Sequence, residues 1–305
     1  MNSPDLDSLL PRLDELRAAL ARAVVGQHTV VEQLLIGLLA GGHCLLEGAP
    51  GLGKTLLVRS LGQALELQFR RVQFTPDLMP SDILGTELLE EDHGTGHRHF
   101  RFQQGPIFTH LLLADELNRT PPKTQAALLE AMQERTVSYA GTTPLPEAQL
   151  DRFLLHVLVD YPSEDEERRI LEQTTGGATD AVPKVMDAEA VIALQAAVRQ
   201  VHVSPDVLAW ITRLVRASRP GEGAPAAINQ WVKWGAGPRA GQSLVLAAKA
   251  RALLQGRFAA TREDVQALAA PVMRHRLLLS FAAEAEQKRA DDVVAALLQA
   301  VPFPG

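Results

Sequence analysis

The segment Gly48–Thr55 constrains the fold of this chain more than any other stretch. It matches the phosphate-binding pattern Gly-x4-Gly-Lys-[Ser/Thr]. A short apolar stretch, residues 43–47, precedes it, and residues 56–65 follow with apolar side chains at helical spacing. Strand, glycine-rich loop and helix in this order are the context that the pattern requires. The sequence therefore predicts an α/β phosphate-loop domain.

The chemistry of such a loop lies mainly in its backbone. Its glycines allow successive N–H groups to point toward phosphate oxygens, and the following helix N-terminus adds a partial positive charge. Lys54 is expected to reach the β- and γ-phosphates, and Thr55 to hold Mg²⁺. Within this segment the predicted contacts to the nucleotide are Gly48, Ala49, Pro50, Gly51, Leu52, Gly53, Lys54, Thr55 and Leu56.

A second motif, Leu111–Glu116, is an apolar strand that ends in two acidic residues. Ligands of parallel sheets bind at the carboxyl edge of the strands, where this pair would lie. Asp115 suits the Mg²⁺ shell, since Mg²⁺ prefers a carboxylate and several waters. Glu116 suits a base that orients an attacking water. Behind a phosphate loop, this pair favours a catalytic interpretation over a solvated strand end.

Composition excludes several other classes of protein. The chain has 305 residues, 46% of them apolar, and a formal net charge of −6, so the total shows no electrostatic footprint for nucleic acid. Cys44 is the sole cysteine, which rules out a disulfide framework. No secretory signal and no apolar run of about 18 residues is visible, and a cytoplasmic protein without membrane insertion is the expectation.

Elements expected along the chain divide it into two parts. Over residues 1–181 short strands alternate with helices, which predicts a parallel sheet covered by helices. Residues 76–108 contain two polar breaks and predict an insertion with a hairpin tip at 90–97. Over residues 182–305 only helices are expected, and Thr261 with Asp264 forms a variant capping box. The prediction is an α/β domain followed by a smaller all-α lid.

Several of these segments, taken together, resemble the MoxR family of AAA+ ATPases. The resemblance covers nearly the whole chain, and the combination of motifs is specific. The matching stretches are residues 48–55, 73–82, 114–119, 122–134, 144–153, 231–240 and 275–280.

This resemblance implies more than the residues alone show. It implies Mg²⁺-dependent ATP hydrolysis in a homo-oligomeric ring, usually a hexamer, that remodels or matures a protein partner. Family members often pair with von Willebrand factor A domain proteins. Arg152 matches an arginine finger that acts on the neighbouring subunit's ATP, and Arg239 matches a second-sensor arginine of the lid. Val25 and Gly26 would line the adenine pocket, and the insertion at 76–104 would face the central channel.

One departure from the family pattern follows Thr143. Family members carry a core strand with a polar first-sensor residue before the segment that starts here at Pro144. About 20 residues are missing, judged from ordinary element lengths. Either this copy is a deletion variant or the polypeptide holds a segment beyond the printed sequence. The cheapest repair of a true deletion would move the strand 153–159 into the vacant slot and displace Arg152.

Two rival functions stay open at this level. One is the ATPase subunit of a metal chelatase, a related AAA+ machine that also carries the insertion. The other is a nucleotide-binding scaffold with little turnover, because its first-sensor strand is missing.

Overall fold

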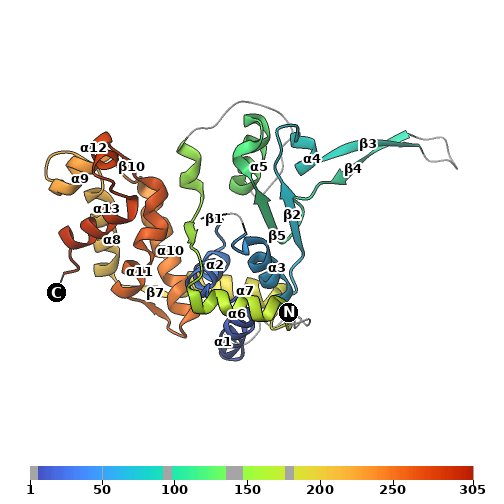
Figure 1. The fold of residues 1–305 in the computed structure, drawn as a ribbon, viewed down its shortest axis with the longest axis horizontal. Helices are drawn as coiled ribbons and strands as arrows, with labels where there is room; N and C mark the ends of the chain where they lie inside the picture. The colour runs from blue at the N-terminus through green and yellow to red at the C-terminus, as the bar shows by residue number, and fades with distance from the viewer. Residues whose placement is uncertain (1–5, 50, 92–97, 135–146, 176–181, 305) are drawn as a thin grey trace.

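The computed structural model describes residues 6–49, 51–91, 98–134, 147–175 and 182–304. It contains an α/β part and a helical part that lie beside one another (Figure 1). Within the described residues, no helix combines the length and the apolar run needed to cross a bilayer.

The α/β part follows the predicted alternation of strands and helices. Two helices open it, α1 (Leu6–Ala23) and α2 (His28–Leu39). The nucleotide motif then spans β1 (Cys44–Gly48) and α3 (Lys54–Ala64), as predicted. The remaining elements are β2 (Phe69–Gln73), α4 (Pro80–Leu84), β3 (Gly85–Glu91), β4 (Arg98–Gln104), β5 (Leu111–Asp115), η1 (Leu117–Arg119), α5 (Pro122–Glu134), η2 (Glu147–Arg152), β6 (Leu155–Val159) and α6 (Glu164–Thr175).

In the part of the chain that the structure describes, the four central strands form two separate parallel pairs instead of one sheet. β1 pairs with β6, with Cys44 opposite Leu155, and β2 pairs with β5, with Phe69 opposite Leu111. All five residues of β5 are only partly buried, whereas β6 alternates between buried and partly buried residues. Parallel strands are normally buried on both faces, so this exposure of β5 marks a break in the sheet.

The expected movement of the strand at 153–159 into the gap between β1 and β5 does not occur. β6 pairs with β1 and, within the described residues, with no other strand. A strand placed between β1 and β5 would pair with both. The prediction that the strand at 153–159 would move into the vacant slot is therefore wrong, because β6 pairs with β1 and not with β5.

The hydrophobic interior is divided in the same way. The larger cluster of buried side chains surrounds β1, β6 and the helices of both parts. A separate small cluster, built on Phe74, Ile83 and Leu128, lies against β2, β5 and α5. Since packed strands normally join their flanking helices into one core, the split core and the split sheet have one origin.

The predicted insertion is an antiparallel hairpin of β3 and β4, in which Gly85 faces Gln104. The hairpin extends away from the rest of the molecule (Figure 1). Phe100 and Leu89 are exposed on it. The predicted tip at 90–97 lies largely outside the described residues, since the structure describes only the backbone of Glu90 and Glu91 there.

The second part is mainly helical, as expected, and its capping box is confirmed by a 2.9 Å bond from Thr261 N to Asp264 Oδ2. The prediction of helices alone is wrong in detail. β7 (His202–Val203) pairs with β9 (Ala259–Ala260), and β8 (Val232–Trp234) pairs with β10 (Leu278–Leu279), because chain turns between the helices run extended for two or three residues. The elements are α7 (Ala188–Gln200), β7 (His202–Val203), α8 (Pro205–Ala217), α9 (Ala226–Trp231), β8 (Val232–Trp234), α10 (Pro238–Leu254), β9 (Ala259–Ala260), α11 (Arg262–Met273), η3 (Arg274–Arg276), β10 (Leu278–Leu279), α12 (Phe281–Ala285) and α13 (Ala290–Ala300).

Candidate nucleotide-binding site

The loop between β1 and α3 needs two of its glycines for their backbone geometry. Gly51 has φ 85° and Gly53 has φ 74°, both in the left-handed region. A Cβ at either position would meet no atom within 4 Å, so space is not the constraint. L side chains rarely adopt these angles, and glycine adopts them without steric cost. These glycines therefore let the loop turn tightly into α3.

The N-terminus of α3 is open to an anion. Gly53 is its N-cap and supplies no side-chain hydrogen bond to the first N–H groups of the helix. Lys54 Nζ donates a hydrogen bond to Gly48 O at 2.7 Å, across the mouth of the loop. An ammonium group and uncapped helix N–H groups together form a site for phosphate oxygens.

Asp115 ends β5 and is paired with a cation. Its Oδ2 accepts hydrogen bonds from Arg71 Nη2 at 2.5 Å and from Arg71 Nε at 3.2 Å. Arg71 comes from the neighbouring strand β2, where it stands opposite Leu113. No pattern in the sequence indicates this pair, because register between strands has no local signature. A metal ion at Asp115 would have to share the carboxylate with Arg71 or displace it.

Glu116 occupies an unusual backbone conformation for a residue with a side chain. Its φ is 57° and its ψ is 38°, in the left-handed region. Such conformations cost about 1–3 kcal/mol and concentrate at functional sites, where the surroundings hold them. The Glu116 carboxylate forms an ion pair with Arg119 at 3.3 Å. The strained position turns the chain sharply after β5, at the edge where Asp115 lies.

A cleft of about 1700 Å³ brings the two motifs together. The predicted residues that line it are Gly48, Gly51, Leu52, Gly53, Lys54, Thr55, Asp115 and Glu116. The Thr55 hydroxyl and the Asp115 carboxylate are oxygen donors of the kind that Mg²⁺ prefers, so the donor set fits this ion. The cleft thus brings the glycine-rich loop, two oxygen donors of this kind and the Glu116 carboxylate into one space.

Other predicted contacts do not line this cleft. Ala49, Val25 and Gly26 lie outside it, Leu56 is 49% exposed on α3, and Pro50 lies outside the described residues. Gly26 has φ 77° and packs tightly beneath α6, since a Cβ there would lie 2.3 Å from Glu166 Cδ. The Glu166 carboxylate in turn accepts hydrogen bonds from Ser163 N and Ser163 Oγ, both at 2.8 Å.

The two predicted arginines also lie outside the lining of the cleft. Arg152 ends η2, and its Nη1 donates to Leu129 O of α5 at 2.9 Å, within the same chain. Arg239 lies in the first turn of α10, with Nη1 3.9 Å from Asp151 Oδ2. Both guanidinium groups therefore have partners within this chain, at or next to η2.

Arg276 joins the two parts of the molecule and is not among the predicted site residues. Its side chain is 1% exposed. Nε donates to Asp151 Oδ1 at 2.7 Å, and Nη2 donates to Phe153 O at 2.6 Å and to Ser243 Oγ at 3.1 Å. Nη1 donates to Val272 O. Burial lowers the pKa of Arg276, and the Asp151 carboxylate opposes that shift. A buried arginine between apolar residues has no sequence pattern of its own, so only the fold shows this role.

His275 lies beside this junction. Its Nε2 is 3.0 Å from Phe153 O, and its ring meets that of His156 edge-on, with centroids 5.8 Å apart. Burial, followed by the charge of Arg276, lowers the pKa of His275 to about 3. The imidazole is therefore neutral at physiological pH and donates from Nε2 to the carbonyl.

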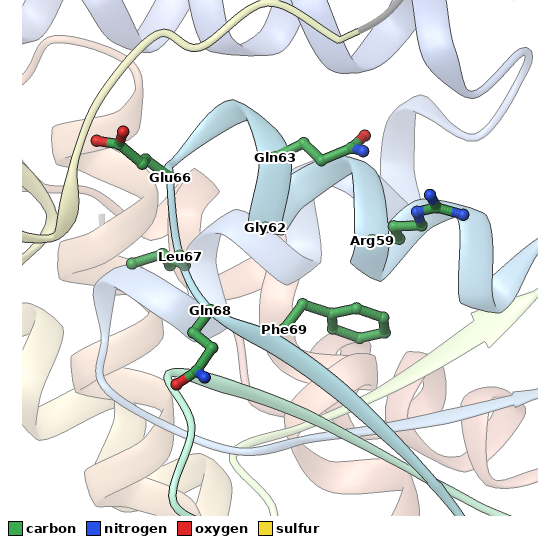
Figure 2. Close-up of a pocket in the computed structure, with 7 residues that line it drawn as sticks. All are labelled: Arg59, Gly62, Gln63, Glu66, Leu67, Gln68 and Phe69. Atoms are coloured by element: carbon green, nitrogen blue, oxygen red, sulfur yellow. The ribbon is translucent and has the colours of Figure 1, made fainter.

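A smaller hollow of about 500 Å³ lies at the other end of α3. Its labelled side chains point in different directions in Figure 2, and Glu66 pairs with Lys184. Convergent polar groups are what distinguish a ligand site. This hollow has none among its lining residues, which are Arg59, Gly62, Gln63, Glu66, Leu67, Gln68 and Phe69.

Phosphate loop, acidic strand end and helical lid together define a nucleotide-binding domain of the AAA+ class. A family model described as "ATPase family associated with various cellular activities (AAA)" matches residues 43–143, and one described as "AAA lid domain" matches residues 225–297. The first match ends at Thr143, the position of the predicted missing strand.

Similar proteins place the chain more narrowly. Chaperone MoxR1 of Mycobacterium tuberculosis is 38% identical, with 93% of this chain and 80% of that protein covered. Protein MoxR of Paracoccus denitrificans is 34% identical, with 96% of each covered. The chain belongs to the MoxR family of AAA+ ATPases.

Two further relatives extend the comparison, and the first of them also bears on the length of the chain. YeaC of Bacillus subtilis is 36% identical, with 98% of this chain and 97% of that protein covered. That alignment spans 321 positions against 305 residues here, so at least 16 positions lack a counterpart in this chain. The solved structure of a putative ATPase from Cytophaga hutchinsonii superimposes with a TM-score of 0.88 at 33% identity, covering 98% of this chain and 97% of that one.

Proposed function

We propose that this protein hydrolyses ATP in a magnesium-dependent reaction and uses the energy to remodel or mature a protein partner. The observation that carries the proposal is the shared cleft, which holds Lys54, Thr55, Asp115 and Glu116 in one space. The chaperone-named relative supports the second half of the proposal. A metal-chelatase subunit, the first rival, has no such support among these relatives.

Each residue then has a defined task. Lys54 would exchange the Gly48 carbonyl for the β- and γ-phosphate oxygens, a charge-assisted contact that is stronger than the one it replaces. Thr55 and Asp115 would hold Mg²⁺, which neutralises charge on the phosphates when bound. Glu116 would accept a proton from the attacking water. The ion pair of Asp115 with Arg71 must open or be shared during this cycle.

The proposal also includes an assembly of several copies of this chain. We propose a homo-oligomeric ring in the cytoplasm, a hexamer by family pattern, with Arg152 acting on a neighbour's nucleotide and Arg239 acting from the lid. Val25, Gly26, Ala49, Pro50 and Leu56 would complete the nucleotide contacts. The β3–β4 hairpin would face the channel, and a von Willebrand factor A domain protein would be the partner. Residues 1–181 and 182–305 form the two domains in this proposal.

A second candidate function is a nucleotide-binding assembly with little turnover. The split sheet favours it, because no strand in the described part of the chain lies between β1 and β5 and could carry a polar group toward the cleft. Binding and turnover separate the two functions, since the second requires only binding.

The test compares ATP affinity and ATP turnover in the parent and two variants. Lys54→Ala should abolish binding, because it removes the cation that faces the phosphates. Glu116→Gln should keep binding and reduce turnover by at least 100-fold, as expected for loss of a general base. Arg59→Ala and Glu130→Gln, on exposed positions outside the cleft, are the matched controls. Full turnover in Glu116→Gln would refute the catalytic role, and tight binding without parental turnover would establish the second candidate.

A further inference from the structure

Arg276 of the lid holds the backbone on both sides of Arg152. Its Nη2 donates to Asp151 O at 3.1 Å and to Phe153 O at 2.6 Å, the carbonyls of the residues that flank Arg152. Nε of the same guanidinium donates to Asp151 Oδ1 at 2.7 Å. Nη2 also donates to Ser243 Oγ of α10 at 3.1 Å, which anchors the guanidinium in the lid. One buried side chain therefore fixes the path of the chain through Arg152.

The residues next to Arg276 reach the same segment. His275 Nε2 donates to Phe153 O at 3.0 Å, and Arg274 Nη1 donates to His156 O at 3.0 Å. All three residues of η3 thus donate to backbone carbonyls within residues 151–156. Because the acceptors are backbone atoms, these bonds hold the position of the chain itself.

The 3₁₀ helix η2, which ends at Arg152, depends on bonds of this kind. It is six residues long. Hydrogen bonds in 3₁₀ helices have poorer geometry than those in α-helices, and runs longer than three or four residues are uncommon. The Arg152 guanidinium donates to Leu129 O at 2.9 Å. It can leave that carbonyl by rotation of the side chain while the lid keeps the backbone in place.

We infer that Arg276 is a positioning residue for Arg152: it holds the end of η2 where the Arg152 guanidinium can reach the nucleotide of a neighbouring subunit. This inference rests on the proposed role of Arg152 in a ring. A misplacement of about 1 Å in a group that acts on the reacting atoms can cost about 100-fold in rate. Loss of the backbone bonds should therefore reduce turnover more than nucleotide binding.

Arg276→Lys tests this geometry without removing the charge. The ammonium still faces Asp151, but one nitrogen cannot replace the separate contacts of Nε and Nη2. Nucleotide affinity should stay nearly unchanged, and kcat should fall at least tenfold. Arg257→Lys is the matched control, because Arg257 pairs with Asp264 at 2.6 Å inside the lid. It should keep the parental kcat.

Mixed assemblies separate positioning from general damage to the fold. Lys54→Ala chains supply Arg152, and Arg152→Ala chains supply the nucleotide site, so a mixture of the two should regain turnover where these halves meet. Arg276→Lys added to the Lys54→Ala chain should lower the regained turnover at least tenfold, because that chain supplies Arg152. The same substitution added to the Arg152→Ala chain should change it little, because Arg152 is already absent there.

His275 provides a second pair of variants should Arg276→Lys fail to fold. His275→Leu removes the bond to Phe153 O, and His275→Gln keeps a donor for it. On the Lys54→Ala chain, His275→Leu should lower the regained turnover, and His275→Gln should preserve it.

The outcomes distinguish this inference from the function on which it rests. Equal losses from the two placements of Arg276→Lys, or full turnover with both, would overturn the inference and leave the role of Arg152 intact. Equal turnover with His275→Leu and His275→Gln would do the same where that pair is used. No regained turnover in the starting mixture, once shown to co-assemble, would refute the action of Arg152 on a neighbour and this inference with it.

Discussion

At the scale of single residues, Asp151 is one of the residues that tie the two parts of the protein together. Its carboxylate accepts a 2.7 Å bond from the buried Arg276 and lies 3.9 Å from Arg239. Arg152, the next residue, donates to Leu129 O. The Asp151 carboxylate thus compensates a buried guanidinium and lies near Arg239, while Arg152 is held by α5.

Asp151→Asn tests this tie. Removing one partner of a buried pair leaves an uncompensated charge, which costs about 3–5 kcal/mol when both groups are buried. Asp151 is 36% exposed, so we expect about 2 kcal/mol after allowance for solvent screening. A fall in Tm, with a lower kcat at nearly unchanged KM, should follow in calorimetry and ATPase assays.

Asp291→Asn is the matched control for that variant. Asp291 is also 36% exposed and forms a two-bond pair with Arg274, yet it contacts neither Arg276 nor Arg239. It should lower Tm less and leave kcat intact. Equal effects of the two substitutions on Tm and kcat would show that Asp151 acts only as an ordinary ion-pair partner.

His275 should make stability depend on pH. Its pKa is about 3 in the folded chain, chiefly through burial, and near 6.5 when unfolded. Below pH 6.5 the unfolded state binds the extra proton, so stability falls as pH falls, by about 1.4 kcal/mol per unit until pH 3. At pH 5 the loss is about 2 kcal/mol relative to pH 7.

His275→Gln keeps a donor for the Phe153 carbonyl but does not titrate in this range. Urea unfolding of both proteins at pH 7 and pH 5 therefore measures the histidine contribution. The variant should lose less stability than the parent between these two pH values. Identical losses would show that His275 is protonated without penalty in the folded chain.

At the scale of elements, local patterns predicted the elements well and their pairing poorly. Apolar spacing located β5 at 111–115 and α11 at 262–273, and capping chemistry located the start of α11. The gap after Thr143 was predicted from family pattern, but the predicted move of the strand at 153–159 was wrong. Strand pairing depends on contacts between distant residues, such as Cys44 with Leu155, which leave no periodic trace in either segment. The pairing of Arg71 with Asp115 and the junction at Arg276 were missed for the same reason. The left-handed backbone of Glu116 was missed as well.

The split core predicts unequal stability of the two strand pairs. β6 contributes Leu155 and Val157, both fully buried, to the larger cluster. β5 packs mainly against a small cluster of three buried residues. Regions with few buried apolar contacts open at low free energy. Native-state hydrogen exchange should therefore be at least tenfold faster in β5 than in β6, a difference of about 1.4 kcal/mol. Equal protection in both strands would show that the two pairs unfold as one unit.

At the scale of the whole molecule, Arg152 decides whether the active site belongs to one chain or to two. Within one chain it is tied to α5 and lies outside the cleft. A finger role requires that a neighbouring subunit present its cleft to η2, as in a ring with head-to-tail interfaces. A structural role requires only the bond to Leu129 O.

Mixing subunits separates these roles. Arg152→Ala and Lys54→Ala chains should each be inactive alone, since each lacks one half of every site. In an equal, random mixture about a quarter of head-to-tail interfaces pair an intact Lys54 with an intact Arg152 from the neighbour. Those interfaces should hydrolyse ATP, because a finger in trans is worth roughly 10³–10⁵ in rate in other nucleotide hydrolases. The control mixes Lys54→Ala with the Lys54→Ala/Arg152→Ala double variant, in which no interface holds an intact Lys54. Recovery in the first mixture alone places Arg152 in trans. Failure to recover in mixtures shown to co-assemble leaves Arg152 as the tie between η2 and α5 that it is within a single chain.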